Sequence, residues 1–144
     1  MNRRFNYIRP IRWGDTDAAG IVFTAHYFDM CMEAIEAWFK QVIGEDWYTM
    51  NLESNIGTPF VHSELDFSSP MTPKDVLSII VEVHRIGNSS LGFSVKGEKS
   101  ESEKSVFNGK FTCCFCNMDN FQPIEIPEMI KTKINIYNKS VHNT

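Results

Sequence analysis

Hydrophobic and polar residues alternate along most of the chain, but one long segment follows a different pattern. From about Ala25 to Ile43, apolar residues recur at helical spacing and cover most of the helix surface. Such a wide apolar surface predicts a long helix that is largely enclosed by the rest of the protein. Gly44 follows directly and suits the left-handed backbone that often ends a helix. Before this helix, the alternation in Phe5–Arg12 predicts a strand.

Period-two alternation also dominates the chain after the long helix, beyond a short helix expected at Trp47–Glu53. It predicts four further strands, which span Ile56–Phe67, Asp75–Arg85, Ser90–Glu98 and Lys104–Asn117. In the first of these strands, the alternation places Val61, Leu65 and Phe67 on one apolar face. Turn-forming residues join the last three, and strands joined by hairpins form an antiparallel sheet. One apolar helix must then pack on that sheet. The element order predicts the α+β hotdog fold, a five-stranded antiparallel sheet wrapped around one long central helix.

The length of 144 residues fits a single domain, and the chain has no internal repeat or linker-like segment. We expect one domain over residues 1–137, followed by a polar tail over residues 138–144 that frays. A single helix cannot cover every face and edge of a sheet. The protein is therefore expected to form a homodimer, with a homotetramer as the fuller assembly.

The charge pattern argues against several classes of partner. The formal net charge is −4, and lysine and arginine form neither the basic stripe of a nucleic-acid-binding protein nor one face of a membrane-surface helix. No apolar run reaches the ~18–20 residues that span a membrane, and the N-terminus has no apolar signal-peptide centre. We expect a cytoplasmic protein that neither binds nucleic acid nor inserts into a membrane.

Four cysteines raise the question of a metal site. Three of them, Cys113, Cys114 and Cys116, lie in one short apolar run, and Cys31 lies in the predicted helix. Zinc sites usually combine spaced cysteine pairs with further ligands. Free cysteine is among the most often buried residue types. We therefore interpret the run as small apolar residues in a buried strand, and we expect neither a metal nor a cofactor.

The segment richest in chemical groups joins the first strand to the long helix. It carries two acids, Asp15 and Asp17, and Gly20 permits a close approach of the backbone. The free amides of a helix N-terminus follow at about Thr24–His26 and can hold an anion or a developing oxyanion. A carboxylate beside such a site can attack a carbonyl or activate water. Between the acids and the helix lies an apolar lip of Ile21, Val22 and Phe23.

A purely structural interpretation competes with this one. Asp15 and Asp17 can instead form Asx-turns and cap the helix, and composition alone slightly favours that interpretation. Asp15 is expected to be structural in either case, and an isolated histidine such as His26 is more often a packed helix residue than a catalyst. The Gly-x-Ser-x-Gly elbow, the Gly-x-x-x-x-Gly-Lys phosphate loop and the His-Glu-x-x-His metal helix are absent from the sequence.

The same segment resembles the signature of a known family. The run from Gly14 to Phe23, Gly-Asp-Thr-Asp-Ala-Ala-Gly-Ile-Val-Phe, followed by Tyr27, is similar to the motif of the 4-hydroxybenzoyl-CoA thioesterase family. The similarity extends from about Arg9 to Ile130 and includes the segments Gly57–Val61, Asp75–Ile79 and Ile124–Pro127. The resemblance implies the hotdog fold. It also implies hydrolysis of an aromatic or short-chain acyl-CoA, or of an acyl carrier protein thioester, without a cofactor.

The resemblance further implies roles for particular residues. Asp17 is the catalytic carboxylate, as nucleophile or general base, and the backbone N–H of Thr24 polarises the thioester carbonyl. The acyl pocket lies between two subunits and joins the loop to a strand of the second copy. Its implied residues are Gly20, Ile21, Val22, Phe23, His26, Phe28 and Met32, together with Thr58, Pro59, Phe60, Val61 and His62. The implied CoA contacts are Arg85, Asn88, Ser89 and Ser90.

Three departures from the family pattern leave the substrate open. Thr24 stands where the related Tol–Pal-associated thioesterases usually carry histidine. Met32 matches an aspartate that meets the substrate hydroxyl in the 4-hydroxybenzoyl-CoA enzyme. We therefore expect poor discrimination for a hydroxyl or a preference for an apolar acyl group. The turn Gly87–Ser90 lacks the basic residues that contact phosphate in that enzyme.

Two other functions on the same fold stay open. A hydratase or dehydratase needs a histidine and an acid across the subunit interface, for which His26, His62 or His84 with Glu64 are the candidates. A non-catalytic module that binds acyl thioesters is the other alternative. Thiol release from acyl-CoA esters separates both alternatives from hydrolysis.

Overall fold

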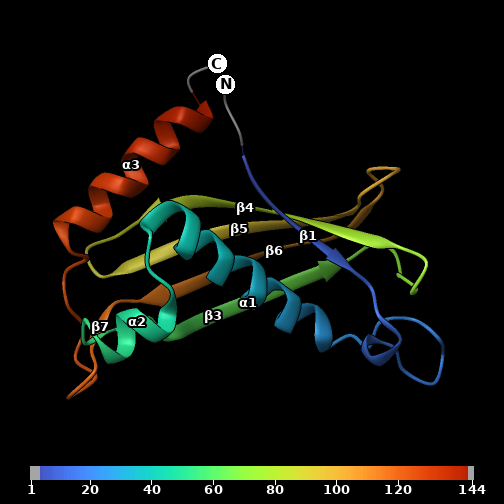
Figure 1. The fold of residues 1–144 in the computed structure, drawn as a ribbon, viewed down its shortest axis with the longest axis horizontal. Helices are drawn as coiled ribbons and strands as arrows, with labels where there is room; N and C mark the ends of the chain where they lie inside the picture. The colour runs from blue at the N-terminus through green and yellow to red at the C-terminus, as the bar shows by residue number, and fades with distance from the viewer. Residues whose placement is uncertain (1–3, 143–144) are drawn as a thin grey trace.

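The computed structural model describes residues 4–142 and contains one five-stranded sheet with a long helix lying across it (Figure 1). The sheet contains β1 (Phe5–Pro10), β3 (Phe60–Phe67), β4 (Val76–Ile86), β5 (Ser90–Lys99) and β6 (Ser105–Cys114). The strand order is β1-β4-β5-β6-β3, and every neighbouring pair is antiparallel. A separate short pair joins β2 (Ile56–Gly57) to β7 (Cys116–Asn117). This arrangement confirms the predicted hotdog fold.

The central helix forms as its apolar pattern predicts. Helix α1 (His26–Trp38) continues into the π-helical turn η2 (Phe39–Ile43), and the chain leaves the helix at Gly44, where φ is 89°. Glycine adopts this left-handed backbone readily because it has no Cβ. The further helices are the 3-10 turn η1 (Trp13–Asp15), the short α2 (Trp47–Leu52) and the C-terminal α3 (Glu128–His142).

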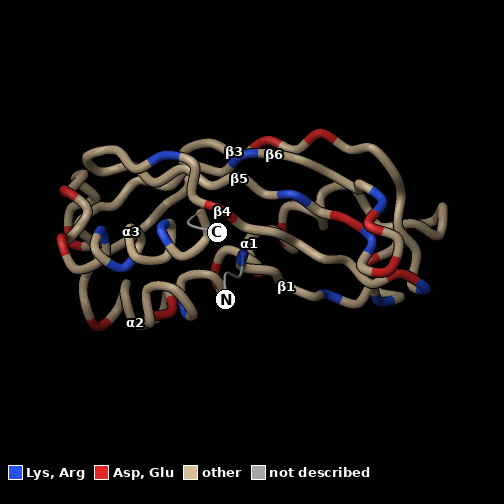
Figure 2. Tube along the Cα trace, turned by 90° about the horizontal axis from the view of Figure 1, so that it is seen from above, with Lys and Arg blue, Asp and Glu red and all other residues tan. Residues whose placement is uncertain are grey.

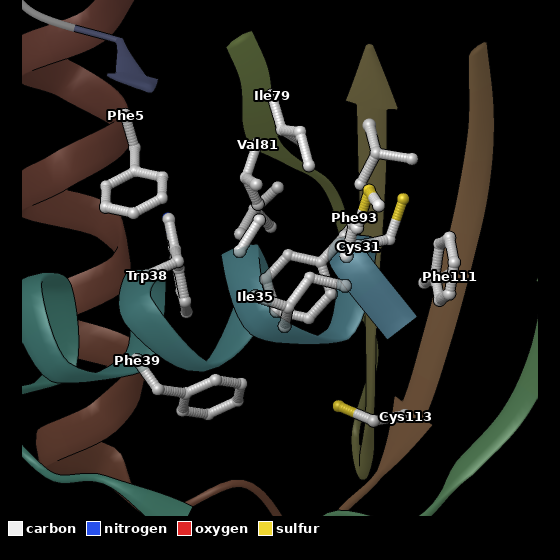
Figure 3. Close-up of a cluster of buried hydrophobic side chains, with 14 of the residues drawn as sticks. Phe5, Cys31, Ile35, Trp38, Phe39, Ile79, Val81, Phe93, Phe111 and Cys113 are labelled. Carbon is white, nitrogen blue, oxygen red and sulfur yellow. The ribbon is translucent and has the colours of Figure 1, made fainter. Parts of the chain in front are cut away.

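The core lies between α1 and the sheet, and its largest fully buried side chains are aromatic (Figure 3). Trp38 of α1 is fully buried, and its ring meets the ring of Phe93 on β5 edge-on, with 5.0 Å between the ring centroids. Ile79 and Val81 of β4 are also fully buried, as the alternation predicts. Each large apolar side chain buried in this way contributes about 1.5–3 kcal/mol. The core therefore gives the loop before α1 a rigid base.

The cysteines lie where the apolar interpretation expects them. Cys31, Cys113 and Cys116 are buried, Cys114 is half-buried, and all four are free thiols. Burial raises the pKa of the Cys113 thiol to about 12, so this side chain stays protonated. Within residues 4–142, no three His, Cys, Asp or Glu side chains gather as a metal site would require.

The C-terminal segment contradicts one prediction. The polar tail predicted from residue 138 is wrong as far as residue 142, because α3 continues through His142. Ile134 and Val141 are buried, and Tyr137 Oη accepts a hydrogen bond from the Phe5 N–H at 3.0 Å. These apolar residues recur at helical spacing, while mostly polar residues and the exposed Ile136 fill the positions between them. Residues 1–3 and 143–144 lie outside the described residues.

Strand β3 forms one edge of the sheet and is largely exposed. The side chains of Val61 and Phe67 are 68% and 44% exposed, although the alternation predicts that both share a buried face with Leu65. A register shift between Phe60 and His62 interrupts the alternation at this point, and β3 has β6 as a neighbour on one side only. The other side of β3 is open to a further strand.

None of the helices within residues 4–142 combines the length and the apolar character needed to cross a membrane. Lysine and arginine are interspersed with aspartate and glutamate along the described chain (Figure 2).

Candidate active site

The loop between β1 and α1 closes on itself through backbone hydrogen bonds. The N–H of Asp17 donates to the carbonyl of Ile21 at 2.9 Å, and the N–H of Gly20 donates to the carbonyl of Asp17 at 3.0 Å. Gly20 has a φ of 78°, which a side chain would strain. The N–H of Val22 donates to the carbonyl of Met71 at 3.0 Å, which ties the loop to the β3–β4 connection. Asp17 is thus held at an exposed, ordered turn.

The Asp17 carboxylate has one oxygen engaged locally and one available. Oδ1 accepts a hydrogen bond from the Ala19 N–H at 2.8 Å, which forms an Asx-turn. Within the described residues, the second oxygen accepts no hydrogen bond, and the carboxylate has no ion-pair partner. One oxygen of Asp17 is therefore engaged in a turn, as the structural interpretation expects, and the other has no partner within the described residues.

The start of α1 offers backbone donors that the fold does not use. The first bonds of the helix come from the N–H groups of His26 and Tyr27, which donate to the carbonyls of Phe23 and Thr24. The N–H groups of Thr24 and Ala25 donate to no acceptor within residues 4–142, and no side chain caps the helix. Unpaired amides at the positive end of a helix favour a negatively charged oxygen. Two open N–H donors therefore lie at the start of α1, next to the Asp17 loop in the chain.

Asp15 has the structural role that the sequence indicates. Both of its carboxylate oxygens bind the guanidinium of Arg9, and Oδ2 also accepts a hydrogen bond from the Arg12 N–H at 2.7 Å. Burial acts to raise the pKa of Asp15, but the hydrogen bonds from Arg9 and from the Arg12 backbone outweigh burial and lower it. Asp15 therefore stays ionised inside the loop.

His26 is packed against the same loop. Its Nδ1 lies 3.2 Å from the Asp15 carbonyl oxygen, and its ring meets the ring of Phe23 edge-on with 5.4 Å between centroids. A carbonyl oxygen only accepts hydrogen bonds, so this contact is a hydrogen bond when Nδ1 carries a proton. These contacts support the interpretation of His26 as a hydrogen-bonded helix residue.

Two clefts each hold part of the predicted substrate residues. A cleft of about 300 Å³ lies between the loop and the β3–β4 connection. It is lined by Ile21, Val22, Thr24, Tyr27, Phe67, Ser68, Ser69 and Pro70. A more apolar cleft of about 410 Å³ is lined by Met32, Trp47, Asn51, Gly57, Thr58, Pro59, Phe60, Met118 and Phe121. A single protomer therefore does not bring the two groups of predicted residues into one cavity.

Other predicted residues lie outside both clefts. Phe28 packs on Phe111 with 6.1 Å between ring centroids, and His62 on exposed β3 pairs with Glu64 at 3.2 Å. Gly20, Phe23 and Val61 are exposed.

Several lining residues are absent from the sequence-based set. Tyr27 is the clearest, because it directly follows His26 in the motif and is 5% exposed. Burial raises the pKa of Tyr27 to about 12, so its phenol stays neutral. Trp47, Met118 and Phe121 line the apolar cleft although they are distant in sequence from the motif. The position of Tyr27 at the start of the helix could have predicted its place in the cleft. The position of Met118 could not, because its contacts depend on how distant parts of the chain fold together.

The four predicted CoA contacts gather at the β4–β5 turn. The Arg85 guanidinium donates to Ser90 Oγ at 3.2 Å. The carbonyl oxygens of Asn88 and Ser89 accept hydrogen bonds from Ile126 and Phe115 at 2.8 and 2.7 Å. These bonds hold the turn in one conformation and leave the Arg85 side chain exposed.

The sheet, the enclosed central helix and the acid-bearing loop at the helix start together define a hotdog-fold protein. Residues 11–134 match the model of the family described as the Thioesterase-like superfamily, and the chain belongs to that superfamily. Among solved structures, a thioesterase superfamily protein from Jannaschia sp. CCS1 matches with a TM-score of 0.86 at 35% identity. That alignment covers 94% of this chain and 96% of the other.

Two sequence relatives share one name. A 1,4-dihydroxy-2-naphthoyl-CoA hydrolase from Crocosphaera subtropica is 41% identical over 73 residues, which cover 51% of this chain and 53% of that protein. A protein of the same name from Synechococcus elongatus is 27% identical over 132 residues, which cover 92% of this chain and 96% of that protein. The chain thus spans about half the length of the first curated relatives it matches.

These comparisons confirm the predicted resemblance at the level of the superfamily. They do not single out the 4-hydroxybenzoyl-CoA branch, because the curated relatives carry the name of a different CoA hydrolase. The identity of the acyl group therefore rests on the site.

Proposed function

We propose that this protein is an acyl-CoA thioesterase that hydrolyses an aromatic acyl-CoA. The observation that carries the proposal is the pairing, in one loop, of a half-engaged carboxylate at Asp17 with unpaired amides at Thr24 and Ala25. The name shared by the sequence relatives, 1,4-dihydroxy-2-naphthoyl-CoA hydrolase, supports an aromatic acyl group. The reaction needs no cofactor, because the CoA thioester is itself the substrate.

In the proposed mechanism, the thioester carbonyl oxygen accepts a hydrogen bond from the Thr24 N–H at the positive end of α1. Asp17 takes a proton from water as the water oxygen attacks the carbonyl carbon. The negative charge that develops on the carbonyl oxygen is stabilised by the helix-start amides. Collapse of the tetrahedral intermediate breaks the C–S bond, and the departing sulfur takes up the proton that Asp17 removed from water, which restores the Asp17 carboxylate. The products are the free acid and CoA.

A second route uses the same residues. Asp17 attacks the carbonyl carbon directly and CoA leaves as the thiolate. Water then hydrolyses the resulting mixed anhydride, which restores the Asp17 carboxylate and releases the proton that the thiolate takes up. Both routes require an exposed carboxylate oxygen at Asp17 and a donor at Thr24. Both of these features are present in the loop.

We further propose that a second copy completes the acyl pocket. Strand β3 has an open edge, and Val61 and Phe67 on it are exposed apolar residues. Pairing of two copies along β3 would bury these side chains and bring Thr58–His62 of one copy toward the loop of the other. Apolar lining residues such as Met32 and Phe60 then suit an aromatic acyl group. The β4–β5 turn with Arg85 is the proposed contact for the nucleotide part of CoA.

A thiol-release assay tests the proposed function. The wild-type protein is mixed with CoA esters of naphthoyl, benzoyl, hydroxybenzoyl, phenylacetyl, short aliphatic and long-chain acids. We expect the fastest release from aromatic esters. Tight binding without release would instead indicate an acyl-binding module, and addition or loss of water on enoyl or hydroxyacyl esters would indicate a hydratase.

A further inference from the structure

Arg9 on β1 occupies an unusual position, because it is a nearly buried cation that the proposed chemistry does not use. Its side chain is 11% exposed, and it faces Asp15, whose side chain is 13% exposed. Nη1 binds Asp15 Oδ2, and Nη2 donates to Asp15 Oδ1 at 3.0 Å. Nη1 also donates to the Pro10 carbonyl at 2.9 Å. This two-point contact fixes the plane of the Asp15 carboxylate as well as its position.

A second carboxylate anchors Arg9 from the helix side. Nε of Arg9 lies 3.6 Å from Glu33 Oε1, and the Tyr7 hydroxyl donates to the same oxygen at 3.1 Å. Glu33 belongs to α1, and Tyr7 belongs to β1. Arg9 therefore joins three parts of the molecule, which are the edge strand, the central helix and the turn η1.

Asp15 also contacts the start of α1, and it directly precedes the Asp17 turn in the chain. Its carbonyl oxygen accepts the Phe23 N–H at 3.0 Å and lies 3.2 Å from His26 Nδ1, so it holds the residues on either side of Thr24. Along the chain, Asp15 directly precedes Thr16 and Asp17. One residue thus fixes the start of the Asp17 turn and the start of α1 together.

We propose that Arg9 is a positioning residue that holds the Asp17 carboxylate and the Thr24 amide at the separation needed for thioester hydrolysis. Arg9 acts through Asp15 and touches neither of the two groups itself. The expected effect on catalysis rests on the proposed function, whereas the ordering of the loop by Arg9 does not. A displacement of about 1 Å between reacting groups lowers rates by about 10²-fold. Lysine cannot reproduce the contact, because one ammonium cannot bind two oxygens of Asp15 and reach Glu33 in fixed geometry.

The test compares Arg9→Met and Arg9→Lys with Arg4→Met as a matched control. Arg4 precedes the same strand and pairs with Glu82 at 3.2 Å, but its side chain is 61% exposed and distant from the loop contacts. We expect Arg9→Met to lower kcat by about 10- to 100-fold while KM stays within about threefold. Arg9→Lys is expected to recover part of the loss, and Arg4→Met is expected to match the wild type.

Hydrogen exchange provides a second readout that needs no activity. We expect the amides of residues 16–25 to exchange faster in Arg9→Met and at the wild-type rate in Arg4→Met. If Arg9→Met does not fold, Glu33→Gln replaces it, with the same effects at about 3- to 10-fold in kcat. The inference is overturned if Arg9→Met keeps the wild-type kcat or the wild-type exchange rates. The same holds for Glu33→Gln if that variant has to replace Arg9→Met. Absence of hydrolysis by the wild-type protein overturns the proposed function instead, and the exchange result still decides whether Arg9 orders the loop.

Discussion

The C-terminal end of α1 and the residues just before the helix differ in how they are packed. At the C-terminal end, Trp38 is fully buried and packs against Phe93 on the sheet. Just before the helix, the amides of Thr24 and Ala25 have no acceptor within the described residues, and Phe23 is 49% exposed. One end of the helix is therefore packed in the core, and the other end leaves backbone donors open to solvent. Such a division is typical of functional sites, where local stability is given up for chemistry.

The largest effect on stability is expected at the C-terminal end of α1. Trp38→Ala should lower the free energy of unfolding by about 3–5 kcal/mol, because it leaves a cavity in the core. Phe23→Ala, in the exposed segment just before α1, should lower it by less than about 1 kcal/mol. Denaturant unfolding of both variants measures the difference. Equal losses would mean that the segment before the helix is packed as tightly as the C-terminal end of the helix.

A smaller loss is expected at the base of the loop. Asp15→Asn removes the charge that pairs with nearly buried Arg9, and it should lower the free energy of unfolding by about 2–3 kcal/mol at pH 7. Asp29→Asn is a suitable control, since Asp29 is exposed on α1. Comparable values for the two variants would show that the Arg9 pair adds nothing to stability.

The same pair predicts a pH dependence. The pKa of Asp15 is lower in the folded protein than its usual value of about 3.9, so its stabilising effect is fully present above that value. The effect is lost as the pH falls through the folded-state pKa. The difference in unfolding free energy between wild type and Asp15→Asn should therefore shrink as the pH is lowered from 7 to below about 4. A difference that stays constant with pH would contradict the assignment.

The smallest of these effects is expected where α3 meets the sheet. Tyr137→Phe removes a hydroxyl that accepts from the Phe5 N–H and donates to the Val81 carbonyl at 3.4 Å. The free energy of unfolding should fall by about 1 kcal/mol, measured by denaturant unfolding. Tyr48→Phe is the control, because Tyr48 is 69% exposed. A loss equal to that of Trp38→Ala would indicate that α3 is as important to the fold as the core.

Elements with a strong hydrophobic period could be predicted from the sequence. Helix α1 and the strands β4 and β5 follow their patterns because their inner faces are buried within one chain. The pattern gave a wrong result at Val61, where β3 is an edge strand and the register shifts. The helical period of α3 was not recognised, because polar residues surround a narrow apolar stripe that includes Ile134.

The site was predictable in part. Asp15 and Asp17 lie in the expected loop, and the open amides follow at Thr24 as the helix start implies. The different environments of Asp15 and Asp17 could be predicted only in part. They depend on the contact between Arg9 and Asp15, which the sequence pattern does not reveal. The full lining of the apolar cleft could not be predicted, because Met32 and Met118 are distant in sequence and come together only in the folded protein.

The proposed hydrolysis at the open helix start depends most on Asp17. The decisive measurement is kcat/KM for thiol release by Asp17→Asn, taken with its free energy of unfolding. We expect kcat/KM to fall by about 10²- to 10⁴-fold, because asparagine can neither accept the proton nor attack the carbonyl. The free energy of unfolding should stay within about 0.5 kcal/mol of wild type, because the asparagine Oδ1 still accepts from Ala19. Near wild-type hydrolysis by Asp17→Asn would contradict the account and leave Asp17 as a turn residue only.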